Sequence, residues 1–262
     1  MTNRNIPIYV ISLASDTERR QQLQEKFPES YNFFQFIEAL DLRGKKKSEI
    51  SHLYIESPYN KRKPLTPTEV ACSLSHETAW ATFIKTKLPW CIILEDDVYG
   101  HDDDIRETVN IIRKLEGSGF FLLGGQQGMK NSKYILGTRQ DKHWIIDRRS
   151  LMFCTRACSY AISRETAIEL ISQNKKYLDR SDNWETRLRK IPNLYYINKI
   201  KHPENLNGSH LESESEKSFG TSAAANIYRD GATRLIKVNL RKMQIIFLAL
   251  FSKKELIIGR KK

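Results

Sequence analysis

The sequence predicts an α/β fold, and three observations support this prediction. Short apolar runs of β-favouring residues recur along the chain, as expected for buried strands. Segments that begin with helix-capping residues lie between these runs. The run from Trp90 to Leu94 ends abruptly in three acidic residues, Glu95, Asp96 and Asp97. Strands that alternate with helices are typical of α/β proteins, whose ligands usually bind at strand ends.

Composition indicates a folded globular protein. The chain has 262 residues, 40% hydrophobic and 10% aromatic, which suits one large domain or two small ones and excludes a disordered chain. Its four cysteines are scattered and include no CxxC pair, so we expect free thiols in a reducing compartment, without a disulfide scaffold or a zinc site. The polar start, Met1 to Pro7, carries no secretory signal, and no apolar run is long enough to span a bilayer.

The charge balance indicates an anionic partner. Lysine and arginine exceed aspartate and glutamate by 43 − 31 = 12. Such an excess is typical of proteins that contact nucleic acid, phosphorylated sugars or an acidic membrane surface. The basic residues cluster at 43–47, at 61–63 and in the last 26 residues, away from the acidic centre.

The first strand is expected at Ile6–Ile11, closed by Ser12, and a helix should follow from Ser15-Asp16 to about Phe27. A strand end that faces a helix N-terminus, with Arg19 and Arg20 in the first turns, can hold a diphosphate. Alternatively, these arginines solvate the outer face of the helix, and we favour that interpretation for one of the two.

A second apolar run, Phe33–Ile37, predicts another strand, and the unpatterned stretch 43–64 predicts an irregular excursion. Thr66-Pro67-Thr68-Glu69 then forms a capping box with proline at the first helical position. His76 lies in the middle of this helix, where a hydrogen-bonded core position is more common than a catalytic role. The helix should run to about Lys87 and turn four residues inward: Val70, Leu74, Ala81 and Ile84.

The acidic end of the Trp90–Leu94 run admits two interpretations. Three carboxylates at the mouth of a buried strand repel one another, and Mg²⁺ or Mn²⁺, which prefer hard oxygen ligands, would neutralise them. Alternatively, these residues form an acidic turn in water together with Asp102, Asp103 and Asp104.

The second half of the chain continues the alternation. Gly124-Gly125, at the end of one apolar run, predicts close approach of the backbone to a ligand, or a plain tight turn. The stretch 126–149 predicts a loop or a small hairpin beside the site. The expected strands are Phe120–Leu123, Ala157–Ser163 and Tyr195–Ile197, and the expected helices are Asp103–Leu115 and Ser163–Asn174, the latter with Ser163 as its cap.

The end of the chain differs from the rest, so we divide the protein into a main domain, 1–236, and a basic amphipathic tail, 237–262. Met243–Phe251 is apolar apart from Gln244 and lies between Arg241-Lys242 and Lys253-Lys254. This pattern predicts either an interfacial anchor on anionic lipid or a helix packed on the main domain.

Several of these segments, in this order, resemble glycosyltransferase family 25, the bacterial lipopolysaccharide and lipooligosaccharide transferases related to the collagen galactosyltransferases. Each motif alone is weak, but the ordered set spans roughly residues 6–185. The helix entry departs from the family, because Thr68–Cys72 reads TEVAC where Gly-Glu-Ile-Gly-Cys is expected. The matching motifs are Tyr9–Leu13 followed by Glu18-Arg19-Arg20, Phe36–Asp41, Leu65–His76, Ile93–Val98 and Ser159–Ser163.

The resemblance implies a GT-A fold, a nucleotide-sugar-binding catalytic domain with a mixed, mostly parallel sheet flanked by helices. It implies that Glu95-Asp96-Asp97 stands where many GT-A enzymes carry Asp-x-Asp, with Asp97 holding Mn²⁺ or Mg²⁺ on the diphosphate of a UDP-sugar. A late histidine, His202 first and His210 second, would be a further metal ligand. The residues expected to border the nucleotide are Ser12, Leu13, Arg19, Asp41, His76, Glu95 and Asp96.

The resemblance also implies inversion at the anomeric carbon, so a carboxylate must deprotonate the acceptor hydroxyl from the face opposite the diphosphate. Asp182 is the first candidate for this base, with Glu185 and Asp179 as alternatives. A helix cap or a surface ion pair with Arg180 would explain Asp182 equally well. Trp184 is a candidate for stacking on a sugar ring.

The predicted function is transfer of a hexose onto the lipopolysaccharide or lipooligosaccharide core, with UDP-galactose as the first choice of donor and UDP-glucose as the alternative. The protein is expected in the cytoplasm, peripheral on the anionic inner face of the bacterial cytoplasmic membrane and attached through its tail.

A metal-dependent nuclease or phosphotransferase is the second hypothesis, but it predicts more than one acidic cluster at strand ends. A nucleic-acid-binding protein is the third. Dispersed basic residues and the lack of a nucleic-acid motif oppose it, so no nucleic-acid partner is expected.

Overall fold

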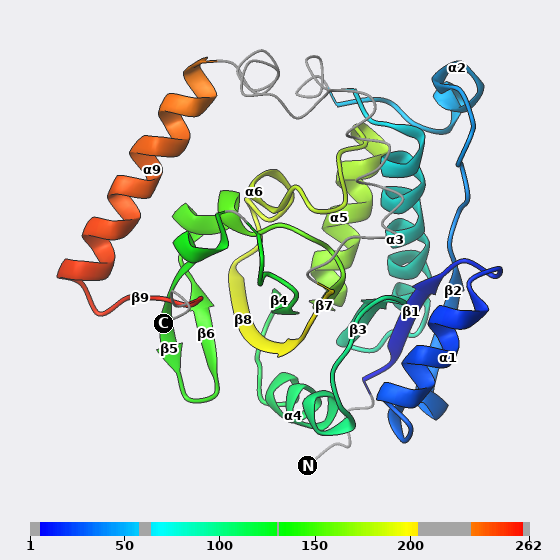
Figure 1. Cartoon of the computed structure of the whole chain (residues 1–262), viewed down its shortest axis with the longest axis horizontal. Helices are drawn as coiled ribbons and strands as arrows, with labels where there is room; N and C mark the ends of the chain where they lie inside the picture. The colour runs from blue at the N-terminus through cyan, green and yellow to red at the C-terminus, as the bar shows by residue number, and fades with distance from the viewer. Residues whose placement is uncertain (1–5, 58–63, 130, 204–231, 259–262) are drawn as a thin grey trace.

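The computed structural model describes residues 6–57, 64–129, 131–203 and 232–258. Within these ranges, nine strands form one sheet in the order β2-β1-β3-β7-β4-β8-β6-β5-β9 (Figure 1). The strands are β1 Ile8–Ser12, β2 Phe34–Glu38, β3 Trp90–Glu95, β4 Gly119–Gly124, β5 Leu136–Gln140, β6 His143–Ile146, β7 Ser159–Ser163, β8 Asn193–Ile200 and β9 Glu255–Leu256.

The directions of the strands confirm the predicted mixed, mostly parallel α/β sheet. Strands β1, β2 and β3 run parallel to one another, and β4 is parallel to β8. Strand β7 lies antiparallel between β3 and β4, and β6 and β9 also run against their neighbours. Because β1 and β3 are parallel neighbours, their carboxyl ends, at Ser12 and Glu95, open on the same edge of the sheet.

Helices cover both faces of the sheet and enclose two hydrophobic cores. Side chains alternate between the faces along β3, so Cys91 and Ile93 belong to one core and Ile92 and Leu94 to the other. The first core is closed by α3 (Pro67–Lys85) and α5 (Arg164–Lys176), and the second by α1 (Thr17–Lys26) and α4 (Asp102–Ile112). The short helix α6 (Trp184–Arg187) adds Trp184 to the first core, and α2 (Lys47–Ile50) contributes Ile50 to a third, smaller hydrophobic cluster.

Helix α3 begins as predicted but turns a different side inward. Thr66 Oγ1 accepts from Glu69 N at 3.2 Å, and Glu69 Oε2 accepts from Thr66 N at 2.9 Å, which completes the capping box. Of the four predicted inward residues only Val70 is fully buried. Leu74 and Ile84 are half-buried against hydrophobic clusters. The prediction was incomplete because the sheet-facing side includes polar groups that have hydrogen-bond partners there, which an apolar pattern does not reveal. This side carries His76, Ala79, Trp80 and Phe83.

The paired glycines at the end of β4 are explained by packing and not by a ligand. Both have positive φ, 144° at Gly124 and 72° at Gly125, a conformation that glycine adopts at little cost. A Cβ on Gly124 would collide with the backbone carbonyl of Ile200 in β8, and one on Gly125 with the sulfur of Cys158. Close packing of β4 on β8 and β7 therefore replaces the predicted ligand approach.

The predicted hairpin within 126–149 is present as β5 and β6, which pair antiparallel. The stretch 43–64, expected to be irregular, contains α2 and a 3₁₀ turn, Ser51–Leu53, in its described part. The expected helices after Asp97 and Ser163 are α4 and α5, and Ser163 caps α5 by accepting from Thr166 N at 3.2 Å.

The tail packs on the main domain and also exposes an apolar face. Helix α9 (Ala232–Phe251) buries Ile245 completely against the first core, and β9 pairs with β5 (Figure 1). Lys254 forms an ion pair with Asp147. Among the described helices, none is both long and apolar enough to cross a membrane. The outer face of α9, which we define by its exposed apolar residues, comprises Ile236, Leu240, Met243, Ile246, Phe247, Leu250 and Phe251.

Candidate active site

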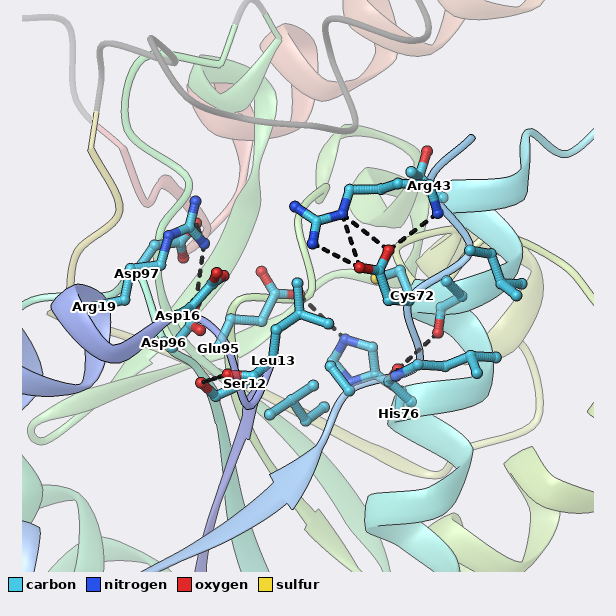
Figure 2. A pocket seen from close by; sticks show the side chains of 18 residues that line it. Ser12, Leu13, Asp16, Arg19, Arg43, Cys72, His76, Glu95, Asp96 and Asp97 are labelled. Atoms are coloured by element: carbon cyan, nitrogen blue, oxygen red, sulfur yellow. Dashed lines mark hydrogen bonds and ion pairs between the residues drawn. The ribbon is translucent and has the colours of Figure 1, made fainter. Parts of the chain in front are cut away.

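The carboxyl ends of β1 and β3 border a cavity that α1, α3 and the segment after β2 complete (Figure 2). We call it the donor cavity, after the nucleotide-sugar donor that its residues were predicted to bind. Asp97, the predicted metal ligand, lines it. The structure thus brings together residues that are far apart in the sequence and that were predicted to act together. All the residues predicted to border a nucleotide line this cavity: Ser12, Leu13, Arg19, Asp41, His76, Glu95 and Asp96.

Arg19 bridges the acidic strand end. Its Nη1 donates to Asp96 Oδ1 at 2.9 Å and lies 3.6 Å from Asp97 Oδ2. Burial raises the pKa of Asp96, and hydrogen bonds with Arg19 and Ser12 offset only part of that rise. Arg20 has a different role, because its Nε donates to Ser12 Oγ at 3.0 Å and holds the end of β1. Of the two arginines, Arg19 therefore serves the cavity and Arg20 the fold.

Asp97 and His202 form a pair that fits a divalent cation. His202 Nε2 lies 3.4 Å from Asp97 Oδ2. The other ring nitrogen, Nδ1, lies 2.9 Å from Pro203 O, so Nδ1 carries a proton and Nε2 is the atom turned to the carboxylate. Asp97 Oδ1 is buried and has no hydrogen-bond partner among the described residues. An unpaired buried oxygen is costly, and a hard cation would satisfy it, so the donor set suits Mn²⁺ or Mg²⁺.

The charges of this pair follow from its surroundings. Burial acts to raise the pKa of Asp97, but His202 and Arg19 outweigh it and leave that pKa lowered. Burial likewise acts to lower the pKa of His202, but the hydrogen bond with Asp97 outweighs it and leaves that pKa raised. A metal ion at this place would displace the Nε2 proton, because a histidine ligand must be neutral. His210, the second predicted ligand, lies outside the described residues.

A buried chain of hydrogen bonds holds Glu95 at the cavity wall. Trp80 Nε1 donates to Tyr160 Oη at 2.8 Å, Tyr160 Oη lies 2.9 Å from His76 Nδ1, and His76 Nε2 lies 3.1 Å from Glu95 Oε1. The Glu95 carboxylate can only accept, so His76 Nε2 donates to it, and in this tautomer Nδ1 accepts from the Tyr160 hydroxyl. His76 is thus a hydrogen-bonded core group, as the sequence favoured, and it also positions a carboxylate.

The opposite wall carries an ion pair and a thiol. Arg43 Nε and Nη2 donate to the Asp41 carboxylate at 2.9 and 2.6 Å. Cys72 Sγ lies 3.2 Å from the hydroxyl of Ser181, and burial raises the pKa of the Cys72 thiol, which keeps it neutral. Cys72, His76 and Glu95 lie close enough to share a metal ion. Cys72 Sγ and both ring nitrogens of His76 have partners within the protein, whereas Asp97 Oδ1 has none among the described residues.

Asp182, the predicted base, lines a neighbouring cavity that we call the acceptor-side cavity. A 3₁₀ segment (Arg148–Phe153), residues 180–186 and the start of α9 form its walls. The two cavities are adjacent, since Cys72 of the donor cavity contacts Ser181. Among the described residues Asp182 forms no ion pair, and its carboxylate accepts only from the backbone of Arg156, at 3.4 Å. The ion pair with Arg180 that the sequence allowed is therefore absent from the described part of the chain.

The alternative bases are occupied. Asp179 is buried, and its Oδ2 accepts from Asn183 at 2.6 Å, while Glu185 pairs with Lys237 at 2.8 Å. The predicted stacking role of Trp184 is wrong, because its ring is 1% exposed and packs against Phe120, with ring centroids 4.6 Å apart. An aromatic residue beside two carboxylates resembles a sugar site in sequence, but only the fold shows whether the ring is reachable.

Sequence analysis missed several residues of the donor cavity. Arg43, Cys72 and Ser75 line it, and Tyr160 supports it from behind. Two signals were available: Cys72 and Ser75 lie inside the Leu65–His76 motif, and Tyr160 lies inside the Ser159–Ser163 motif. For Arg43, only its place two residues after Asp41 pointed to the cavity.

A family model described as glycosyltransferase family 25, LPS biosynthesis protein, matches residues 5–184. The chain belongs to glycosyltransferase family 25. The matched region contains the donor cavity and Asp182 but neither His202 nor α9. His202, the predicted metal ligand, and the tail of this family-25 chain thus lie outside the matched region, and their predicted roles depend on the geometry alone.

Curated relatives agree with this assignment. The lipooligosaccharide biosynthesis protein lic2B of Haemophilus influenzae is 38% identical over 92 residues, which are 34% of this chain and 33% of the relative. The human procollagen galactosyltransferase 2 is 32% identical over 97 residues, 35% of this chain and 15% of the relative. The matches thus span a third or less of these relatives. Among solved structures, Staphylococcus aureus TarS 1–349 in complex with UDP-GlcNAc aligns over 94% of this chain and 73% of that one, with 14% identity and a TM-score of 0.42.

Proposed function

We propose that this family-25 protein is a metal-dependent, inverting hexosyltransferase that uses a UDP-sugar, with UDP-galactose as the first choice of donor and UDP-glucose as the alternative. The observation that carries the proposal is the Asp97–His202 pair, with its unpaired carboxylate oxygen, at the edge of a cavity between two parallel strand ends. Strand ends of this kind are where α/β proteins bind nucleotides.

The residues of the donor cavity divide the work of binding. Asp97 and His202 would hold Mn²⁺ or Mg²⁺, which when bound supplies Lewis-acid stabilisation of a departing diphosphate. Arg19, whose side chain is 31% exposed, is placed at the same edge to donate to phosphate oxygens. Glu95, held by His76, offers an oriented carboxylate to sugar or ribose hydroxyls. The Asp41–Arg43 pair closes the opposite wall.

Asp182 is the proposed general base. Inversion requires a carboxylate that takes the acceptor proton while the hydroxyl attacks the anomeric carbon from the side opposite the leaving group. Asp182 has no cation partner among the described residues, so its carboxylate is available for a hydroxyl. Its place in the cavity next to the donor cavity agrees with attack from a second substrate.

The proposed acceptor is the core of lipopolysaccharide or lipooligosaccharide, as the family description and the lic2B relative indicate. We place the protein in the cytoplasm, on the inner face of the bacterial cytoplasmic membrane, with the outer face of α9 in the lipid interface. That face combines exposed apolar residues with nearby basic residues, Arg241, Lys242 and Lys253, the composition of interfacial helices on anionic lipid.

The test is a transfer experiment with purified protein, truncated lipopolysaccharide acceptors and three donors: UDP-galactose, UDP-glucose and UDP-N-acetylglucosamine. Each is run with Mn²⁺, with Mg²⁺ and with a chelator, and the product linkage is determined by NMR. We expect metal-dependent transfer of galactose with a β-linkage from the α-linked donor. Transfer of glucose alone would select the alternative donor, an α-linked product would refute inversion, and full activity with the chelator would refute the metal. No transfer of any of the three sugars, with cleavage of nucleic acid to shorter fragments or nucleotides instead, would favour a nuclease.

A further inference from the structure

The acceptor-side cavity is bordered by charged side chains from three parts of the chain. Arg180 and Asp182 come from the segment before α6, and Glu185 from α6 itself. Arg234 and Lys237 come from the first turns of α9. Three cations and two carboxylates thus face one space, an excess of 3 − 2 = 1 positive charge.

These charges are only partly compensated by one another. Lys237 Nζ lies 2.8 Å from Glu185 Oε1, with the two side chains 56% and 39% exposed, and Arg180 Nε lies 3.9 Å from Glu69 Oε1, a distant pair. Arg234 forms no hydrogen bond or ion pair with any other described residue. Exposed pairs of this kind are weak, so an anionic ligand can draw these cations to itself.

The walls of the cavity also suit a ligand rich in hydroxyl groups. Thr155 and Asn183 contribute polar side chains next to Asp182. The hydroxyl of Thr155 is buried and has no hydrogen-bond partner among the described residues. Buried polar groups are nearly always paired, so a wall with an unpaired hydroxyl fits a site that receives hydrogen bonds from a bound molecule.

We propose that the acceptor-side cavity binds the acceptor through an anionic group, a phosphate or a carboxylate carried on the saccharide. Arg234, Lys237 and Arg180 bind this group, and Asp182 faces a neighbouring hydroxyl of the same molecule. The assignment of the saccharide as the acceptor rests on the proposed function. The preference of this cavity for anionic sugars over neutral sugars rests on the charges alone.

The arrangement of α9 favours a saccharide attached to a lipid. Residues three, four and seven apart lie on one face of a helix, and the stripe through Arg234, Val238, Arg241 and Ile245 turns toward the domain, with Ile245 fully buried. The exposed apolar residues of α9 lie on the other side of the helix. One helix therefore forms a wall of the cavity and presents an apolar face for the membrane, so a sugar at the lipid surface is close to the cavity.

The experiment measures binding of three probes by ligand-observed NMR titration: galactose 6-phosphate, galacturonate and galactose. We compare the wild-type chain with R234Q/K237Q and with K175Q/K253Q. The control removes the same charge from two exposed lysines outside the cavity. Thermal unfolding of each variant checks folding, and UDP binding with Mn²⁺ checks the donor cavity.

The wild-type chain is expected to bind at least one anionic probe about tenfold more tightly than galactose, as charge-assisted hydrogen bonds predict. R234Q/K237Q should lose that preference and K175Q/K253Q should keep it. A preference for only one of the two anions would identify phosphate or carboxylate as the group recognised. Equal binding of all probes, or an unchanged preference in R234Q/K237Q, would overturn the proposal. Failure of UDP to bind with Mn²⁺, together with an intact anion preference, would instead count against the proposed function.

Discussion

Replacement of Asp97 by asparagine is expected to abolish the stabilisation of the protein by UDP with Mn²⁺. Asparagine keeps the size of the side chain but removes its negative charge and replaces one of the two carboxylate oxygens by an NH2 group. Only His202 would then remain of the pair. A single supporting group of a metal site typically contributes about 10–100-fold to metal affinity, and a direct anionic ligand should lie at the upper end of that range.

The size of the effect follows from mass action. With UDP and Mn²⁺ at about 100 times the dissociation constant, the native state gains about 2.7 kcal/mol, and affinity weakened about 100-fold would reduce this to about 0.4 kcal/mol. At about 2–4 °C per kcal/mol for a chain of this size, the ligand-induced rise in Tm should fall from about 5–10 °C to about 1 °C.

The measurement is thermal unfolding, with and without UDP, in Mn²⁺ and in a chelator. The rise is compared within each variant, because Asp97 also pairs with Arg19 and His202 in the free protein, at 3.6 and 3.4 Å. Asp103→Asn is the matched control, since that carboxylate is 85% exposed on α4. An equal rise in wild type and Asp97→Asn, or a rise that persists without Mn²⁺, would refute the assignment of Asp97 as a metal ligand.

Three further predictions concern the fold and the tail. Tyr160→Phe leaves His76 Nδ1 and Trp80 Nε1 without their partner and should reduce the free energy of unfolding by about 2–4 kcal/mol. Tyr9→Phe is the control, because it removes a buried hydroxyl that has no partner among the described residues, and it should not destabilise the protein. Equal losses in chemical denaturation would contradict this. Burial acts to raise the pKa of Asp147, but Arg149 and Lys254 lower it overall. Its contribution to stability is therefore present above the unfolded value and lost as pH falls below about 4, and Asp147→Asn should flatten that part of the stability profile. An unchanged slope would show that the ion pair is not formed in solution. Phe251→Glu in α9 should weaken binding to anionic liposomes about tenfold or more. Phe33→Glu should not weaken it, although the Phe33 side chain is about as exposed as that of Phe251 (72% against 73%). Equal effects of the two variants in a liposome sedimentation assay would refute the membrane contact through α9.

The sequence was most informative where local pattern and chemistry coincide. The apolar run that ends in Glu95, Asp96 and Asp97 defined both a strand and the edge of a cavity, because a strand end fixes where its last side chains lie. The capping box at Thr66 was equally reliable, since it depends on residues three positions apart. Candidate residues near these features were predicted with the correct location, although their roles stay predictions.

Features that depend on distant parts of the chain were not predictable. Nothing local indicates that β7 inserts antiparallel between β3 and β4, and this insertion brings Tyr160 to His76. Nothing local separates the buried ring of Trp184 from an exposed one. The tail left two interpretations open because α9 has apolar residues on more than one face, and the structure uses one face for packing while the other stays exposed.

Helix α3 connects the donor cavity with the segment that carries Asp182. On the donor side, His76 holds Glu95. One turn earlier, Ser73 Oγ donates to Asp179 O at 2.9 Å, and Cys72 contacts Ser181, which fixes the segment that carries Asp182. If the two cavities hold donor and acceptor, their separation is set by α3 and not by the loops around them. A bulky replacement at Ser73, which is buried and does not line the donor cavity, should therefore impair transfer in an activity assay more than it impairs UDP binding, since it displaces the proposed base while leaving Asp97 and His202 in place.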